Sequence, residues 1–156
     1  MRKLLRDRRR RDCKDEGRDA GPVGKGLGGD LSSYLDTHVA AWIALGQLDR
    51  LSTAATEHIR HSDLLISPAV LLEFEYLYET KRFTLPALDI ARKLEHEIGV
   101  RVCRLEFSQV AIAGLQEKWT RDAFDRLIVA NAKANVLSPL VTADRVIREQ
   151  YPRAIW

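Results

Sequence analysis

The chain has 156 residues and a mass of 17.7 kDa, the length of one compact domain that buries its core without disulfides or a structural metal. Hydrophobic residues make up 46% and charged residues 30%, an ordinary composition for a soluble globular protein. The net charge of +3 is unevenly spread: the first thirty residues hold 10 of the 25 Lys and Arg and 6 of the 22 Asp and Glu, so residues 31–156 carry a net charge of −1. The overall charge therefore does not by itself indicate a nucleic-acid-binding domain.

The first thirty residues differ in composition from the rest of the chain. They hold six of the nine glycines and few apolar side chains. Such a segment buries too little apolar surface to offset its ordering entropy, so we expect residues 1–30 to form a disordered basic, glycine-rich arm, or to come from an overextended start. The run Arg8–Arg11 is suited to phosphate contacts, but a solvated tail is its more ordinary interpretation. We expect one folded domain over residues 31–156.

The expected location is the cytoplasm. No apolar run reaches transmembrane length, and no apolar region of signal-peptide type follows the basic start. Cys13 and Cys103 show no zinc-like spacing with histidines and are expected to be free thiols.

From residue 31 onwards, short apolar runs alternate with helical patterns, which is typical of a parallel sheet covered by helices. Ser67 and Pro68 form a helix start with proline at the first helical position, and Gly99 provides a helix end. The expected strands are 31–35, 64–66, 100–105, 139–142 and an edge strand at 154–155; the expected helices are 37–45, 53–59, 68–81, 85–98, 108–118, one from 122, and 143–149. The predicted fold class is α/β, a three-layer α/β/α sandwich with a mainly parallel sheet.

Acidic residues follow the carboxyl ends of the predicted strands, where open parallel sheets place their functional crevice. Clustered carboxylates repel one another, and hard divalent cations relieve this repulsion, so the set without histidine favours Mg²⁺ or Mn²⁺ over Zn²⁺. Such sites hydrolyse phosphodiester bonds. Each acidic residue alone could be an ordinary helix N-cap or a solvated charge on a helix. Together, however, these residues share one edge of the predicted sheet. The set is Asp36, Glu73, Asp122, Asp125 and Asp144.

Four segments in this order resemble the motifs of PIN domains, and among these the VapC-like toxin ribonucleases of toxin–antitoxin pairs. They are 34–42 (YLDTHVAAW), 67–76 (SPAVLLEFEY), 121–128 (RDAFDRLI) and 140–144 (LVTAD). The third resembles the sequence RDPFDRL of the toxin branch, with Ala123 in place of proline. The resemblance spans about residues 31–156 and leaves out the thirty-residue arm.

The resemblance implies a Mg²⁺- or Mn²⁺-dependent ribonuclease that forms a homodimer and has a cognate antitoxin. By position it implies that Asp36, Glu73, Asp125 and Asp144 are catalytic. It adds Asp122 as a further acid and Thr142 as a hydroxyl that orients a ligand or water. The implied metal ligands are Asp36, Asp122, Asp125 and Asp144.

The substrate and partner expectations are less specific. RNA is the expected substrate, with tRNA as one candidate. Three arginines near the acids either bind its phosphates or are ordinary surface charges: Arg121, Arg126 and Arg145. His38 is expected to be structural rather than RNA-contacting, and Trp42 to belong to the core. An antitoxin arginine could enter the acidic pocket, and apolar grooves near 45–51 and 71–83 could hold an amphipathic antitoxin helix. No membrane partner is expected.

Two other classes of function stay open on the sequence. One is a non-catalytic binding module of a toxin–antitoxin complex on DNA, although such a module has no need of the acidic set. The other is a receiver-like phospho-acceptor domain. That class expects an acid pair after the first strand and a late lysine, whereas this chain has the single Asp36 and has Arg145 after Asp144.

Overall fold

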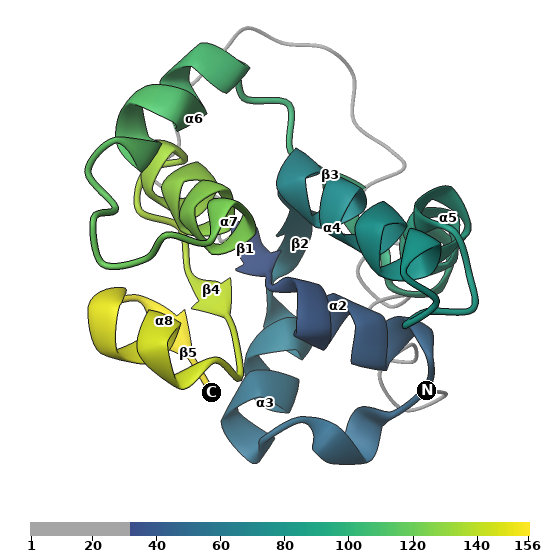
Figure 1. Cartoon of the computed structure of the whole chain (residues 1–156). Helices are drawn as coiled ribbons and strands as arrows, with labels where there is room; N and C mark the ends of the chain where they lie inside the picture. The colour runs from purple at the N-terminus through teal and green to yellow at the C-terminus, as the bar shows by residue number, and fades with distance from the viewer. Residues whose placement is uncertain (1–31) are drawn as a thin grey trace, which may run out of the picture.

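The computed structural model describes residues 32–156, which form five strands, seven α-helices and one 3₁₀ helix (Figure 1). The predicted arm at 1–30, with Arg8–Arg11 and Cys13, lies outside the described residues. In chain order the elements are β1 (Ser32–Leu35), α2 (Thr37–Ala44), η1 (Leu48–Arg50), α3 (Thr53–His61), β2 (Asp63–Ile66), α4 (Pro68–Glu79), α5 (Ala87–Ile98), β3 (Arg101–Val102), α6 (Phe107–Gly114), α7 (Ala123–Ala134), β4 (Leu140–Val141), α8 (Arg145–Gln150) and β5 (Ala154–Ile155).

The five strands form one parallel sheet in the order β3-β2-β1-β4-β5, and helices cover both of its faces. In Figure 1, α6 and α7 lie on one side of the sheet, and α4 and α5 on the other. β1 lies at the centre, with Tyr34 paired to Leu65 on one side and to Leu140 on the other. The predicted α/β/α sandwich is confirmed. Because all strands are parallel, all of their carboxyl ends lie at the same edge of the sheet.

Helix periodicity explains the packing of α5 against the core. Ala87, Ile90, Leu94 and Ile98 recur every three or four residues and are all buried. Gly99 ends the helix in the left-handed conformation at φ 69°, which glycine adopts without a steric penalty. The helix end at Gly99 agrees with the sequence prediction.

Several element boundaries differ from the predictions, three of them for a reason that the structure shows, and one element was not predicted. β3 is two residues long rather than six, because the backbone N–H of Leu105 turns to the Cys103 sulfur instead of continuing the ladder. α6 ends at Gly114 rather than 118, since the chain tightens into turns that bring the Glu117 carboxylate inside. α8 begins at Arg145 because Asp144 is its N-cap, and η1 was not predicted. None of the helices in the described part of the chain is both long and apolar enough to cross a membrane.

Candidate active site

Asp36 is the first acidic residue of the site, directly after β1 at the centre of the sheet. It is the N-cap of α2, and its side chain is buried. Oδ1 accepts a hydrogen bond from the Thr37 N–H at 2.7 Å, and Oδ2 accepts one from the Thr142 hydroxyl at 2.7 Å. Burial raises the pKa of Asp36, while the Thr142 hydrogen bond opposes that rise. Both oxygens are thus held in a fixed orientation at the carboxyl edge.

Glu73 lies on α4, and its carboxylate reaches the same region at the carboxyl end of β1. The Thr37 hydroxyl donates to its Oε2 at 2.5 Å, so Thr37 links the Asp36 and Glu73 carboxylates. Burial raises the pKa of Glu73, and the nearby charges of Asp36 and Asp122 raise it further.

Asp122 and Asp125 stand at the start of α7. Asp122 is the N-cap and accepts from the N–H groups of Phe124 (2.8 Å) and Asp125 (3.2 Å). Asp125, in the first turn, is half-buried. Its pKa is raised to about 7 by desolvation, and next by the negative charges of the surrounding acids, Asp122, Asp36, Asp144 and Glu73. The charges of the other four predicted acids therefore all act on Asp125.

Asp144 completes the set after β4. It caps α8 by accepting from the Ile147 N–H at 2.9 Å, and its own N–H donates to the Thr142 hydroxyl at 3.0 Å. Thr142 is fully buried. One hydroxyl therefore positions both Asp36 and the turn that carries Asp144, which is the geometry expected of the predicted orienting residue.

The donor chemistry of this cluster fits a hard divalent cation. Every candidate donor is a carboxylate or hydroxyl oxygen, the type that Mg²⁺ and Mn²⁺ prefer. The raised pKa of Asp125 reflects burial and, next, uncompensated negative charge that a bound dication would relieve. As the side chains stand in residues 32–156, however, no group of three or more His, Cys, Asp or Glu is arranged to hold a metal ion. The acids share a region of space without converging on one point.

The three predicted phosphate-binding arginines have different surroundings. Arg126 donates to the Thr120 carbonyl at 2.5 Å, and Arg145 forms an ion pair with Glu149 at 2.8 Å on α8. Arg121 is exposed beside Asp122. Arg126 and Arg145 are thus engaged within the chain, although Arg145 is also exposed, and Arg121 is the arginine of the three that has no such contact among the described residues.

An aromatic group borders the acidic cluster along α2. His38 is exposed rather than enclosed, and its positive form would lower the pKa of both Asp36 and Glu73. Its ring lies 6.2 Å from that of Trp42, which lies 6.0 Å from that of Trp156. Trp42 packs against the core but is only partly buried. His38 therefore lies on the surface, and its expected structural role stays a prediction.

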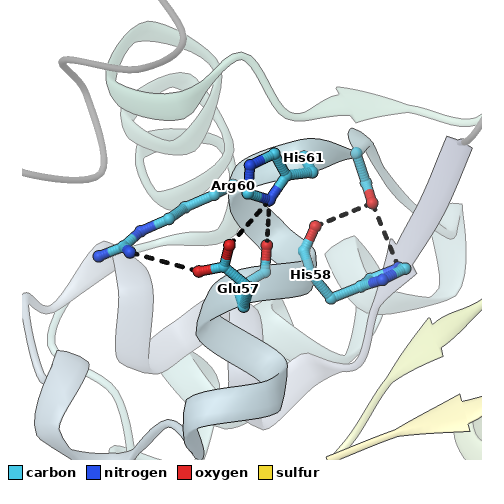
Figure 2. Close-up of polar contacts among 5 residues, drawn as sticks. Glu57, His58, Arg60 and His61 are labelled. Atoms are coloured by element: carbon cyan, nitrogen blue, oxygen red, sulfur yellow. Dashed lines mark hydrogen bonds and ion pairs between the residues drawn. The ribbon is translucent and has the colours of Figure 1, made fainter.

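A second polar cluster, on α3, is separate in its contacts from the acidic residues (Figure 2). Glu57 lies between Arg60 and His61, with ion-pair distances of 3.5 and 3.4 Å. His58 Nε2 lies 2.7 Å from the Ser33 hydroxyl, and burial lowers the pKa of His58. Ser33 is fully buried and out of reach of a substrate. This Ser–His pair therefore ties α3 to β1 and does not act as a nucleophile and base.

Comparison with known proteins identifies the family. Residues 33–151 match the PIN domain family, and the chain belongs to that family. Its fold is similar to that of a chain in the crystal structure of VapBC2 from Rickettsia felis bound to a DNA fragment from their promoter. The TM-score is 0.52 at 16% sequence identity, over 80% of this chain and 96% of that chain. None of the curated proteins compared with the chain matches it.

The strand order bears on the receiver-like alternative. Receiver domains have the order 2-1-3-4-5, whereas this sheet has the order 3-2-1-4-5. Together with the family membership, this difference removes the reason for considering a phospho-acceptor.

Sequence reasoning missed the role of Thr37. Its side chain is buried, and it contacts both Asp36 and Glu73. Its position directly after Asp36 was the available signal, but a threonine at a helix start is common for capping reasons alone. The contact to Glu73 depends on how α4 packs beside α2, which a single sequence does not specify.

Proposed function

We propose that this PIN domain is a metal-dependent endoribonuclease that acts as the toxin of a toxin–antitoxin pair. The observation that carries the proposal is the raised pKa of Asp125, which results first from burial and next from the negative charges of the four surrounding acids. A structural role does not require five carboxylates in one space, because like charges at close range destabilise the fold. Hydrolysis of an anionic phosphodiester through a dication does require such a site.

The residues of the site have distinct proposed roles. Asp36, Asp122, Asp125 and Asp144 would hold Mg²⁺ or Mn²⁺, directly or through water, and Glu73 would be a further ligand or orient the attacking water. A divalent cation there would supply Lewis-acid stabilisation of the charge that develops on the scissile phosphate. Thr142 and Thr37 hold Asp36 and Glu73 in position before the substrate arrives.

Substrate binding would use the exposed Arg121 beside the acids, with RNA as the substrate class and tRNA as one candidate. Arg126 and Arg145 would have to leave the Thr120 carbonyl and Glu149 to contact a phosphate. We therefore rank Arg121 first among the three.

The proposed protein partners are a second copy and an antitoxin. α6 and its C-cap present three large apolar side chains, Phe107, Ile112 and Leu115, each about 70% exposed, as expected of an interface between copies. For the antitoxin, a basic side chain would enter the acidic cluster, and apolar side chains would cover exposed residues such as Leu45 and Leu72 in the two grooves proposed from sequence. The VapBC2 neighbour, a toxin–antitoxin complex on DNA, supports an antitoxin as a partner class.

The test is cleavage of total RNA and of tRNA by the purified protein with Mn²⁺, with Mg²⁺ and with EDTA. We expect cleavage with either ion, none with EDTA, and none from Asp36→Asn. Asp89→Asn, which changes an exposed carboxylate on α5, is the matched control and should cleave like the unchanged protein. RNA cleavage that continues in EDTA and in Asp36→Asn contradicts the mechanism. Intact antitoxin binding without Mn²⁺ binding favours the binding module.

A further inference from the structure

A groove of about 1230 Å³ lies along the edge strand β3, away from the acidic cluster. It continues beneath the amino ends of β1, β4 and β5, where Ser32, Pro139 and Arg153 line it. The acids follow the carboxyl ends of β1 and β4, and none of the five lines the groove. Nothing in the proposed cleavage reaction uses this groove.

The wall of the groove is cationic. Four arginines and the single carboxylate Glu95 line it, although residues 31–156 as a whole carry a net charge of −1. The arginines are Arg92, Arg101, Arg104 and Arg153, and all are exposed. Arg92 has an exposed ion pair with Asp89 at 3.3 Å, whereas no carboxylate within residues 32–156 forms an ion pair with the other three. Unpaired guanidinium groups in a groove complement an anionic ligand.

The floor of the groove is apolar and has no aromatic ring. Its lining includes Leu65, Val100, Val102 and Leu105, and no Phe, Tyr, Trp or His. Single-stranded RNA binding relies on aromatic platforms for the bases, so this floor does not suit RNA. An apolar floor below guanidinium groups suits a peptide with both apolar and acidic side chains.

The backbone of β3 supplies a template for such a peptide. β3 is the last strand at its end of the sheet, and no strand within residues 32–156 pairs with its outer side. The Cys103 N–H donates inwards to the Ile66 carbonyl at 2.9 Å. Since hydrogen-bonding direction alternates along a strand, the N–H and C=O of Val102 point to the outer edge. An extended peptide could pair there and add a sixth strand.

The rim of the groove carries a strained apolar residue. Val136 is 89% exposed and has φ 55°, a left-handed conformation that is rare for a β-branched side chain. Conformations of this kind persist where the surrounding structure requires them, and they are common at binding sites. Val136 thus places an apolar contact beside the arginines.

We propose that this groove is a docking site for an extended segment of a partner protein in which acidic and apolar residues alternate. The segment pairs with the outer edge of β3. Its acidic side chains meet Arg101, Arg104 and Arg92, while its apolar side chains cover Val102 and Leu105. The site is independent of the acidic cluster and does not rest on the nuclease proposal.

Fluorescence anisotropy with the full chain tests the proposal. The probe is a labelled octapeptide of alternating Glu and Val, and its comparison is the same length of alternating Lys and Val. We expect at least tenfold tighter binding of the Glu peptide. Arg101→Glu/Arg104→Glu should reverse this preference. Arg82→Glu/Arg148→Glu, at exposed arginines outside the lining, should leave it within twofold.

Two further probes separate strand pairing from charge alone. N-methylation of every second residue of the Glu peptide removes its backbone donors and should weaken binding at least tenfold. Val102→Pro removes the outward N–H but leaves the hydrogen bond between Cys103 and Ile66 in place. This variant should also weaken binding of the Glu peptide at least tenfold, and circular dichroism checks that it is folded. Equal affinity for the Glu and Lys peptides, unchanged binding after N-methylation, or tighter binding of a single-stranded RNA octamer would each overturn the proposal.

Discussion

Asp125 is an informative single residue, because its pKa is raised first by burial and then by the charges of all four other acids. It is half-buried at the start of α7, where the helix dipole favours a carboxylate, yet its pKa lies near 7. Desolvation and like charge therefore outweigh the helix dipole. Its carboxylate is available for the proposed cation, because Asp122 already provides the helix cap.

The pKa of Asp125 predicts how stability depends on pH. Its pKa is about 7 in the folded chain against 3.8 ordinarily, so the folded state binds more protons between these values, and the free energy of unfolding falls as pH rises. With solvent screening of a half-exposed group, this amounts to about 1–2 kcal/mol lost between pH 4 and pH 8 without metal. Urea denaturation of the metal-free protein and of Asp125→Asn measures the difference. Groups such as His58, whose lowered pKa acts oppositely, cancel between the two proteins. An identical pH dependence in both contradicts the prediction.

Thr142 allows a prediction about orientation. Thr142→Val keeps the shape of the side chain but removes the hydroxyl that donates to Asp36 and accepts from the Asp144 N–H. We expect Mn²⁺ affinity and cleavage rate to fall by about 10–100-fold, as for other groups that orient ligands. Thr142→Ser retains the hydroxyl and is the control, measured by calorimetric Mn²⁺ titration and RNA cleavage. Equal losses in both variants would show that packing, and not the hydroxyl, matters at this position.

At the scale of elements, helix N-caps place the acids. Three of the acids are helix N-caps that accept hydrogen bonds from backbone N–H groups: Asp36, Asp122 and Asp144. Each of these aspartates therefore starts a helix and also places a carboxylate in the acidic cluster. These positions could be predicted from sequence because caps and strand ends are local features. The ends of β3 and α6 could not, because the Cys103 sulfur is held by Tyr34 and Asn131 and the buried Glu117 by Lys133, all distant in the chain.

The segment between α6 and α7 rests on one buried carboxylate. Glu117 accepts from Lys133 Nζ at 2.6 Å and from Trp119 Nε1 at 2.7 Å, and it is 1% exposed. Lys133→Met leaves Glu117 buried without its cation, so we expect a loss of about 2–4 kcal/mol in the free energy of unfolding. The double variant Glu117→Gln/Lys133→Met should lose less, because it buries no unpaired charge. Urea denaturation followed by tryptophan fluorescence measures both. A double variant less stable than Lys133→Met would contradict this explanation.

At the scale of the whole molecule, the sheet order explains the separation of the two surfaces. Parallel strands bring Asp36 and Asp144 to one edge, and they leave β3 as an open side beside the arginine groove. The α/β/α class and the acidic edge could be predicted because the periodicity of hydrophobic residues and the positions of the strand ends can be read from the sequence. The groove could not, because Ser32, Arg101 and Arg153 are far apart in the chain and meet only through the topology.

The central claim is that the acidic cluster cleaves RNA with a divalent cation. The most direct measurement compares cleavage of tRNA by the unchanged protein, by Asp125→Asn and by Asp89→Asn across a Mn²⁺ titration. The account predicts Mn²⁺-dependent cleavage in the unchanged protein and in Asp89→Asn, and a loss of at least about 100-fold in Asp125→Asn, since one ligand and one negative charge are removed. Cleavage by Asp125→Asn at the rate of the unchanged protein, or no cleavage by folded unchanged protein at any Mn²⁺ concentration, would contradict it.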